Sequence, residues 1–285
     1  MPKVDLHIHS TASDGRLSPQ EIVYRAVELG ITIIAIADHD TVDGIAPALA
    51  AAKVFPELKV IPAIEISTDV PGDEVHVLGY FIDYTNPHFI SRLESMRRSR
   101  VERAQKMVAK LKGLGVNIEW ERVQHFAGGS TIGRPHIAQA MLEKGYIGSI
   151  SEAFAKYIGR NGPAYVEREK MTPAEAVKLL LDVNGLPVLA HPLTIRETEA
   201  MIMEMRAAGM VGIEVYYKDY GEEQRNSLRQ LAQKHHLIAT GGSDYHGLED
   251  NEIMIGDAGV PLVAAEQLLA LAEHRALKSV NPKQR

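Results

Sequence analysis

The 285-residue chain contains no cysteine. This absence excludes disulfides, thiolate zinc sites and cysteine nucleophiles. The chain also lacks any apolar run near the roughly 20 residues that span a bilayer, and its first residues form no hydrophobic signal-peptide core. We therefore expect a cytoplasmic protein with no membrane partner.

The chain also has no excess of basic residues. The 31 Lys and Arg residues against 37 Asp and Glu give a formal net charge of −6. Duplex nucleic acid is bound by a broad basic face, so this balance argues against such a partner. A local basic pocket for a small anion is compatible with it. The length suits one large α/β barrel, or a core domain with an insertion.

Apolar runs typical of strands alternate with helical patterns in the first third of the chain. Strands are predicted at 4–10, 31–38, 58–67 and 74–83, and helices at 20–30 and 42–54. Ser18 followed by Pro19 is a typical helix start, an N-cap with proline in the first turn, and Thr172 with Pro173 repeats it. Such alternation is typical of an α/β fold with parallel strands.

The pattern changes after Tyr84. From Pro87 to about Gly162 the sequence is almost wholly helical in pattern. Strands return at 185–192, 211–217 and 236–246, with helices beginning near Thr172, Thr194 and Gly221. We interpret residues 1–85 and 169–285 as one barrel domain, interrupted by a helical insertion domain at 86–168 that caps the substrate site.

Residues able to bind metals gather at the ends of the predicted strands. His7 and His9 lie two apart on one strand, so their side chains share a face. Glu65 and His76 lie in apolar surroundings, where a buried carboxylate is costly unless it is paired or metal-bound. Others follow the strands: Asp14, Asp38, His39, Asp40, His191, Asp244 and His246. Barrel enzymes build their active sites at the carboxyl ends of strands.

Each of these residues also has an ordinary explanation. A single histidine at a strand end is usually a satisfied polar group, and an aspartate there is often a helix N-cap, as Asp40 could be. Repetition at one end of several strands is not expected by chance. The candidate ligands are too many for one ion, since a catalytic zinc usually takes three protein ligands. Mixed imidazole and carboxylate donors suit Mn²⁺ or Fe²⁺, so we predict a polynuclear metal site.

Several segments together resemble the PHP family (polymerase and histidinol phosphatase). They are HIHSTASDG at 7–15, IADHDTVDG at 36–44, the isolated Glu65 and His76, AHP at 190–192 and SDYH at 243–246. The resemblance covers residues 1 to about 84 and about 170 to 255. It implies a distorted (β/α)7 barrel, three divalent metal ions (Mn²⁺, with Fe²⁺ or Zn²⁺ as alternatives), and hydrolysis of phosphate esters.

The resemblance also implies a ligand set. One metal would be held by His7, His9, Glu65 and Asp244; a second by Glu65, His76 and His191; a third by Asp14, His39 and His246. Asp14 stands where some members carry histidine, which changes the charge but not the ability to ligate. Asp38 and Asp40 would orient ring nitrogens or metal-bound waters. His191 or Asp244 would assist proton transfer as catalytic residues.

The insertion carries the sequence STIGRPHIAQAML at 130–142, which resembles the TrpH-like branch of the family. That branch is similar to 3',5'-nucleoside bisphosphate phosphatases, and some members trim short oligonucleotides from the 5' end. Arg134 would offer a bidentate fork to a 5'-phosphate, with His136 as a second donor. Asp40, Lys156 and Arg160 are further candidates for substrate binding. Without the resemblance, Arg134 would be interpreted as a solvated charge.

Three functions compete with the phosphatase. A 5'-to-3' exonuclease on short 5'-phosphorylated oligonucleotides would use the same metals and the same 5'-phosphate pocket. A histidinol-phosphate phosphatase would need a pocket for an amino alcohol, and the long insertion argues against it. A non-enzymatic domain with a degenerate site is disfavoured, because every ligand position is filled.

Overall fold

The computed structural model describes residues 3–70, 73–128, 132–167, 171–247 and 253–280. One sheet contains seven strands in chain order: β1 (Lys3–Ile8), β2 (Ile31–Ile36), β3 (Lys59–Val70), β4 (Asp73–Tyr80), β5 (Leu186–Leu189), β6 (Gly212–Tyr217) and β7 (Ile238–Gly242). The segment after β7 joins β1, where His9 N donates to Tyr245 O and Asp244 N donates to His7 O. The sheet therefore curls into the predicted barrel.

Strand β4 runs against the others. It pairs antiparallel with β3 and β5, whereas the other neighbouring strands pair parallel. The expectation of parallel strands throughout is wrong here, because two residues separate β3 from β4 and a parallel pair needs a crossover of a dozen or more. The reversal brings His76, in the first half of β4, to the end where the other strands finish.

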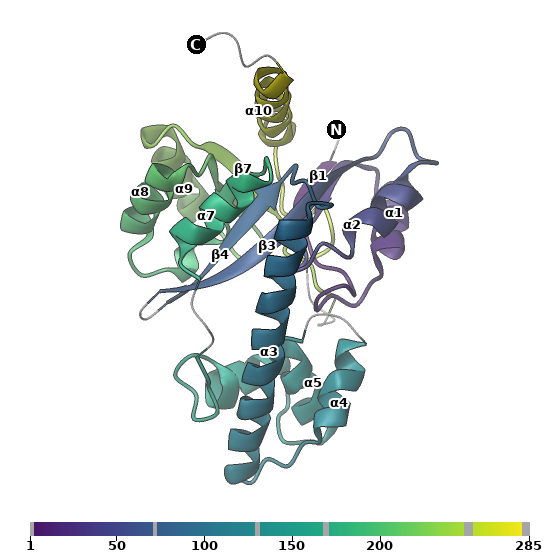
Figure 1. Ribbon diagram of the computed structural model, residues 1–285, viewed down its shortest axis with the longest axis vertical. Helices are drawn as coiled ribbons and strands as arrows, with labels where there is room; N and C mark the ends of the chain where they lie inside the picture. Colours follow the sequence, from purple (N-terminus) through teal and green to yellow (C-terminus); the bar gives the residue numbers. More distant parts are fainter. Residues whose placement is uncertain (1–2, 71–72, 129–131, 168–170, 248–252, 281–285) are drawn as a thin grey trace.

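Helices cover the outside of the barrel on two flanks (Figure 1). One flank has α1 (Pro19–Glu28) and α2 (Ile45–Ala52), and the other has α7 (Pro173–Asp182), α8 (Thr198–Ala208) and α9 (Glu222–Lys234). The capping residues Ser18 and Thr172 begin α1 and α7 as predicted, each in a capping box. The helix expected near Thr194 begins at Thr198, because a 3₁₀ turn occupies Pro192–Thr194.

One end of the barrel is closed by α10 (Leu262–Val280) (Figure 1). Its residues Ala264, Ala265 and Leu268 pack with strand residues such as Ala63 and Leu78 in one apolar cluster. This cluster leaves the opposite end, where the strands finish, for polar side chains. None of the described helices combines the length and apolar character needed to cross a membrane.

The long helix α3 (Pro87–Gly113) joins the barrel to the helical lobe (Figure 1). Phe89 and Leu93 pack in the barrel, whereas Met107 and Leu111 pack in a separate core. That core also contains α4 (Trp120–Ala127), α5 (Arg134–Glu143), α6 (Ile150–Ala153) and a π-helical turn at Phe154–Ile158. The first predicted boundary falls just before α3, whose first turns belong to the barrel packing; the second, at 168–169, lies outside the described residues.

Candidate metal centre

Strand geometry aims several donors into the open end of the barrel. Glu65 pairs with Leu78 and Ser67 with His76, so Glu65 and His76 share the inner face of the β3–β4 pair. Strand β1 shifts its register between Asp5 and Ile8. A bulge of this kind changes the direction of side chains, and His7, which lies between these two residues, contacts Glu65 inside the barrel.

Four donor atoms surround one point at the centre of this group. His7 Nε2 and His9 Nε2 lie 3.1 Å apart. Glu65 Oε2 is 3.3 Å from each, and Asp244 Oδ1 is 3.4 Å from His7 Nε2 and 3.1 Å from His9 Nε2. All four residues are buried. They are the residues expected to hold the first metal.

The other predicted ligands adjoin this group. Glu65 Oε1 is 3.0 Å from His76 Nδ1 and 3.2 Å from His191 Nε2, and these three residues form the second predicted ligand set. The third set is looser. Asp14 Oδ1 is 3.5 Å from His246 Nε2, and Asp14 Oδ2 is 4.0 Å from His39 Nε2. Asp14 itself is only 6% exposed, so the loop that carries it is folded into the site.

The donors overlap in groups that fit divalent cations. Atoms of three groups lie within 4.8 Å of one another: His9, Asp14, His39 and His246; His7, His9 and Glu65; and His39, Glu65 and His76. Four buried atoms in this set lack a hydrogen bond among the described residues, namely His9 Nδ1, Asp14 Oδ1, Glu65 Oε2 and His76 Nε2. Leaving such atoms unsatisfied is costly, and bound cations would relieve that cost.

Backbone strain accompanies the donors. Three residues in the loops near the donors have positive φ although none is glycine: Asp40 (51°), His191 (27°) and Asp244 (49°). Such conformations cost about 1–3 kcal/mol each and persist where the surrounding structure imposes them. His191 and Asp244 turn into the cluster here, where they contact Glu65 and His9, whereas Asp40 bonds to Ser67 and Arg100.

Without metal, the cluster shares protons among its members. Burial lowers the pKa of His9, but bonds to Asp244 and Glu65 outweigh it and raise the value to about 10. Burial also lowers the pKa of His76, but Glu65 and Glu74 outweigh burial and raise this pKa to about 9. Burial takes the pKa of His39 down to about 3 despite the nearby Glu65 and Asp14. The carboxylates therefore take protonated histidines as counter-ions where cations are absent.

These shifts predict the pH dependence of the metal-free protein. The raised pKa values of His9 and His76 give stability that is complete below about pH 6.5, the unfolded value, and is lost as the pH rises through 9 to 10. His39 affects stability at acid pH instead, because its lowered pKa makes the folded protein less stable as the pH falls below about 6.5.

We expect the Tm of chelator-treated protein to be highest near pH 6.5 and to fall toward pH 10. Protein loaded with Mn²⁺ should lose this alkaline decline, because its histidines are already deprotonated. Differential scanning calorimetry of both forms tests this. A flat Tm between pH 7 and 9.5 without metal would contradict the assignment.

Sequence reasoning missed residues that support the ligands. Glu214 on β6 is fully buried, contacts His7 Nδ1 at 3.1 Å and accepts a hydrogen bond from His191 N at 2.7 Å. The sequence does indicate Glu214, because it is a lone carboxylate in the apolar run VGIEVYY, just as Glu65 is in its own strand. Tyr217 donates to Asp244 Oδ2 at 2.8 Å, and Lys218 lies 3.2 Å from the same oxygen. Carboxylates behind metal-ligating histidines fix the ring tautomer.

The two aspartates expected to orient rings or waters make other contacts. Asp38 accepts hydrogen bonds from Ser10 N, Ser10 Oγ and Ser13 Oγ, so it shapes the loop that carries Asp14. Asp40 accepts from Ser67 N at 2.9 Å and pairs with Arg100 Nε at 2.5 Å. These bonds favour a positioning role for Asp40 rather than contact with a substrate phosphate.

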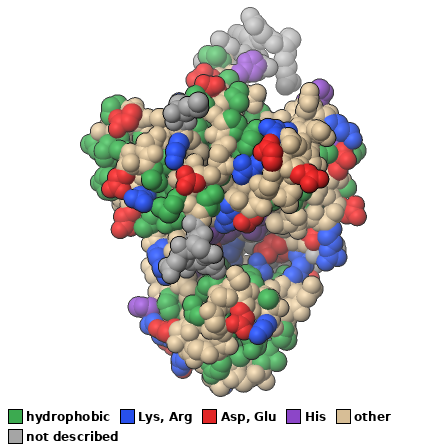
Figure 2. All heavy atoms as spheres, turned by 180° about the vertical axis from the view of Figure 1, so that it is seen from behind, with side chains coloured by type: hydrophobic (Ala, Val, Ile, Leu, Met, Phe, Trp, Pro, Cys, Tyr) green, Lys and Arg blue, Asp and Glu red, His purple; other side chains and the backbone are tan. Residues whose placement is uncertain are grey.

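The insertion brings Arg134 and His136 to the site. Arg134 begins α5, lies over the Phe154 ring and pairs with Glu74 Oε2 at 2.5 Å. His136 accepts a hydrogen bond from Gly133 N through Nδ1, and burial lowers its pKa, so it offers no positive charge at neutral pH. A Cβ on Gly133 would lie 3.8 Å from Asp14 Oδ2. The start of α5 therefore lies against the third donor group, and a hollow separates the two lobes on the rear face (Figure 2).

The two weaker substrate candidates lie elsewhere. Lys156 is 64% exposed and pairs with Glu152 one turn earlier. Arg160 bonds to Asp69 Oδ1 at 3.2 Å and Val70 O at 2.7 Å, which fastens the insertion to the β3–β4 hairpin. Their contacts give no support to a phosphate-binding role.

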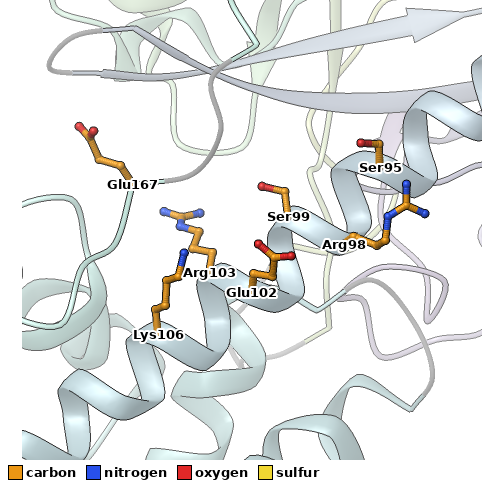
Figure 3. Close-up of a pocket in the computed structure, with 7 residues that line it drawn as sticks. All are labelled: Ser95, Arg98, Ser99, Glu102, Arg103, Lys106 and Glu167. Carbon is orange, nitrogen blue, oxygen red and sulfur yellow. The ribbon is translucent and has the colours of Figure 1, made fainter.

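A separate pocket of about 280 Å³ lies along α3 (Figure 3). Its lining mixes both signs of charge and contains none of the candidate metal ligands: Ser95, Arg98, Ser99, Glu102, Arg103, Lys106 and Glu167. This mixed composition distinguishes it from the histidine-rich cluster at the barrel end.

A barrel with overlapping groups of buried imidazoles and carboxylates at its open end defines a metal-dependent hydrolase. Comparison with known proteins makes this class specific. Residues 5–182 match the PHP domain. A 5'-3' exoribonuclease from Haemophilus influenzae is 34% identical over 248 residues, which cover 86% of this chain and 90% of that protein. A 3',5'-nucleoside bisphosphate phosphatase from Chromobacterium violaceum is 31% identical over 251 residues, 86% of this chain and 88% of that one.

A solved structure extends the likeness to three dimensions. A proposed metal-dependent phosphoesterase from Bifidobacterium adolescentis has a TM-score of 0.86 at 30% identity, covering 94% of this chain and 96% of that one. The chain belongs to the PHP domain family. With its donor set, it is a metal-dependent phosphoesterase of that family.

Proposed function

We propose that the protein hydrolyses the 3'-phosphate of nucleoside 3',5'-bisphosphates in the cytoplasm, using three divalent ions of which Mn²⁺ is favoured. The observation that carries the proposal is the position of Arg134. It reaches Glu74, whose other oxygen lies 3.7 Å from His76 Nε2 in the donor cluster. A short nucleotide with two phosphate groups could therefore contact the cluster with one phosphate and Arg134 with the other.

The donors divide into the three proposed ligand sets. His7, His9, Glu65 and Asp244 would hold one ion, with Glu65 shared by the set of His76 and His191, and with Asp14, His39 and His246 forming the third. Divalent ions here would neutralise the phosphoryl oxygens and lower the pKa of an attacking water. In the reaction, water oxygen bonds to phosphorus, the P–O3' bond breaks, and the 3'-oxygen leaves with a proton.

The chain's own residues position these groups. Glu214 holds the His7 ring and the His191 backbone, while Tyr217 and Lys218 fix the Asp244 carboxylate. Asp244 and His191 are each about 9% exposed, so either could pass a proton to the leaving oxygen. Arg134 would bind the 5'-phosphate, with charge-assisted hydrogen bonds from its guanidinium.

A second activity is favoured by the relatives. The protein of Haemophilus influenzae and another from Escherichia coli, 34% identical over 247 residues, are 5'-3' exoribonucleases. Short 5'-phosphorylated oligonucleotides would place the same P–O3' bond at the same donors, with a further nucleotide on the phosphate. The proposal therefore includes trimming of such oligonucleotides as the alternative substrate class.

A substrate panel tests the proposal. Adenosine 3',5'-bisphosphate, adenosine 3'-monophosphate, 5'-phosphorylated oligonucleotides of two to five residues and histidinol phosphate are assayed with Mn²⁺, Fe²⁺ and Zn²⁺. We expect the bisphosphate to yield AMP and inorganic phosphate with the highest kcat/KM. Faster turnover of the oligonucleotides would select the exonuclease. Preference for histidinol phosphate, or inertness with every ion, would refute both.

A further inference from the structure

Glu74 occupies the space between the proposed 5'-phosphate site and the donor cluster. It is the second residue of β4 and pairs with Asp69, on the same face of the hairpin as Glu65 and His76. One of its oxygens is 2.5 Å from Arg134 Nη2, and the other is 3.7 Å from His76 Nε2. Its side chain is 21% exposed, so solvent and ligands can reach it.

A carboxylate in this position resembles the ligand that Arg134 is proposed to bind. Carboxylates and phosphates both accept paired N–H bonds from the guanidinium fork. Arg134 is held by the Phe154 ring on one side, so its fork has little freedom to serve two anions in different directions. A 5'-phosphate arriving at Arg134 would also meet the negative charge of Glu74, and like charges at such separations repel.

We propose that Glu74 is the exchangeable counter-ion of Arg134, a specificity-determining carboxylate that the 5'-phosphate must displace. The inference rests on the proposed function of the same site. Glu74 holds Arg134 in the absence of ligand and lowers the affinity of Arg134 for every anion that binds there. Because the product AMP keeps its 5'-phosphate, the return of Glu74 to Arg134 also favours release of the product.

Neighbouring pairs show what a purely structural contact would look like. Arg160 with Asp69, and Arg100 with Asp40, also join the insertion to the barrel. If Glu74 only joined the insertion to the barrel, its loss would weaken binding of all substrates alike and lower Tm. As a competitor, its loss must instead strengthen binding, and only for ligands with a 5'-phosphate.

The test compares four variants with the parent. Glu74→Gln removes the charge and keeps the shape, and Glu74→Asp keeps the charge. Glu143→Gln is the matched control, since Glu143 pairs with Arg122 at 2.5 Å elsewhere in the insertion. The double variant Arg134→Ala/Glu74→Gln reports whether Glu74 acts through Arg134. Calorimetry measures the affinity for AMP and adenosine, and steady-state kinetics measure KM and kcat for the bisphosphate and for adenosine 3'-monophosphate.

We expect Glu74→Gln to lower the Kd of AMP and the KM of the bisphosphate by about three- to tenfold, the scale of one partly exposed ion pair, without raising kcat. Adenosine binding and the KM of the 3'-monophosphate should stay unchanged. Glu143→Gln should behave as the parent, Glu74→Asp should show no gain in affinity because it keeps the negative charge, and the gain of Glu74→Gln should vanish when Arg134 is absent.

Two outcomes separate this inference from the proposed function. If the parent does not hydrolyse the bisphosphate but AMP affinity still rises in Glu74→Gln, the function is wrong and the counter-ion role stands. If the parent hydrolyses the bisphosphate while Glu74→Gln weakens or leaves unchanged the binding of AMP, the counter-ion role is overturned alone.

Discussion

Glu65→Gln is expected to remove bound metal and reduce turnover by about a hundredfold or more, since even the groups behind metal ligands are worth 10–100-fold. Both Glu65 oxygens face histidines: Oε2 lies 3.3 Å from His7 and His9, and Oε1 lies 3.0 Å from His76. Glutamine replaces one carboxylate oxygen with an NH2 group that cannot ligate, so the link between two ligand sets is broken.

Metal content is measured by elemental analysis of purified protein, beside kcat/KM with added Mn²⁺. The matched control is Glu119→Gln, whose parent carboxylate pairs with Lys144 on the surface of the insertion. We expect that variant to keep its metal and its rate. Full metal and full activity in Glu65→Gln would disprove the bridging assignment.

Arg134→Ala is expected to lower kcat/KM about ten- to hundredfold, but only for substrates that carry a 5'-phosphate. Loss of a charge-assisted hydrogen-bonded pair costs about 1.5–3 kcal/mol, and 1.36 kcal/mol corresponds to tenfold. Adenosine 3'-monophosphate should be a poor substrate for the parent and nearly indifferent to the change, because it has nothing for Arg134 to bind.

The comparison needs both substrates with both proteins. Arg122→Ala is the control for loss of an arginine in the insertion, since Arg122 pairs with Glu143 away from the donors. An equal loss of kcat/KM with both substrates would mean that Arg134 supports the fold or the metals through Glu74. The 5'-phosphate pocket would then have to be sought elsewhere.

The candidate donors could be predicted from the sequence because their signal is local. A strand of period two places His7 and His9 on one face, and a carboxylate such as Glu65 inside an apolar strand is costly without a partner. Glu214 carries the same signal in VGIEVYY but was not predicted as a site residue, because it lies in none of the segments that resemble the family. The resemblance to the family then assigned the donors to sets, and the structure brings those residues together.

What the sequence by itself determined is the set of elements and the residue types at their ends, since helix caps and strand patterns depend on neighbours within a few residues. Only the tertiary structure decided the reversal of β4, which brings His76 to the cluster, and the burial of Asp14. It also decided the ion pairs between lobes: Arg134 lies 60 residues from Glu74, and Arg100 lies 60 from Asp40. No local pattern records such partners, because their proximity arises from the path of α3 between the barrel and the insertion.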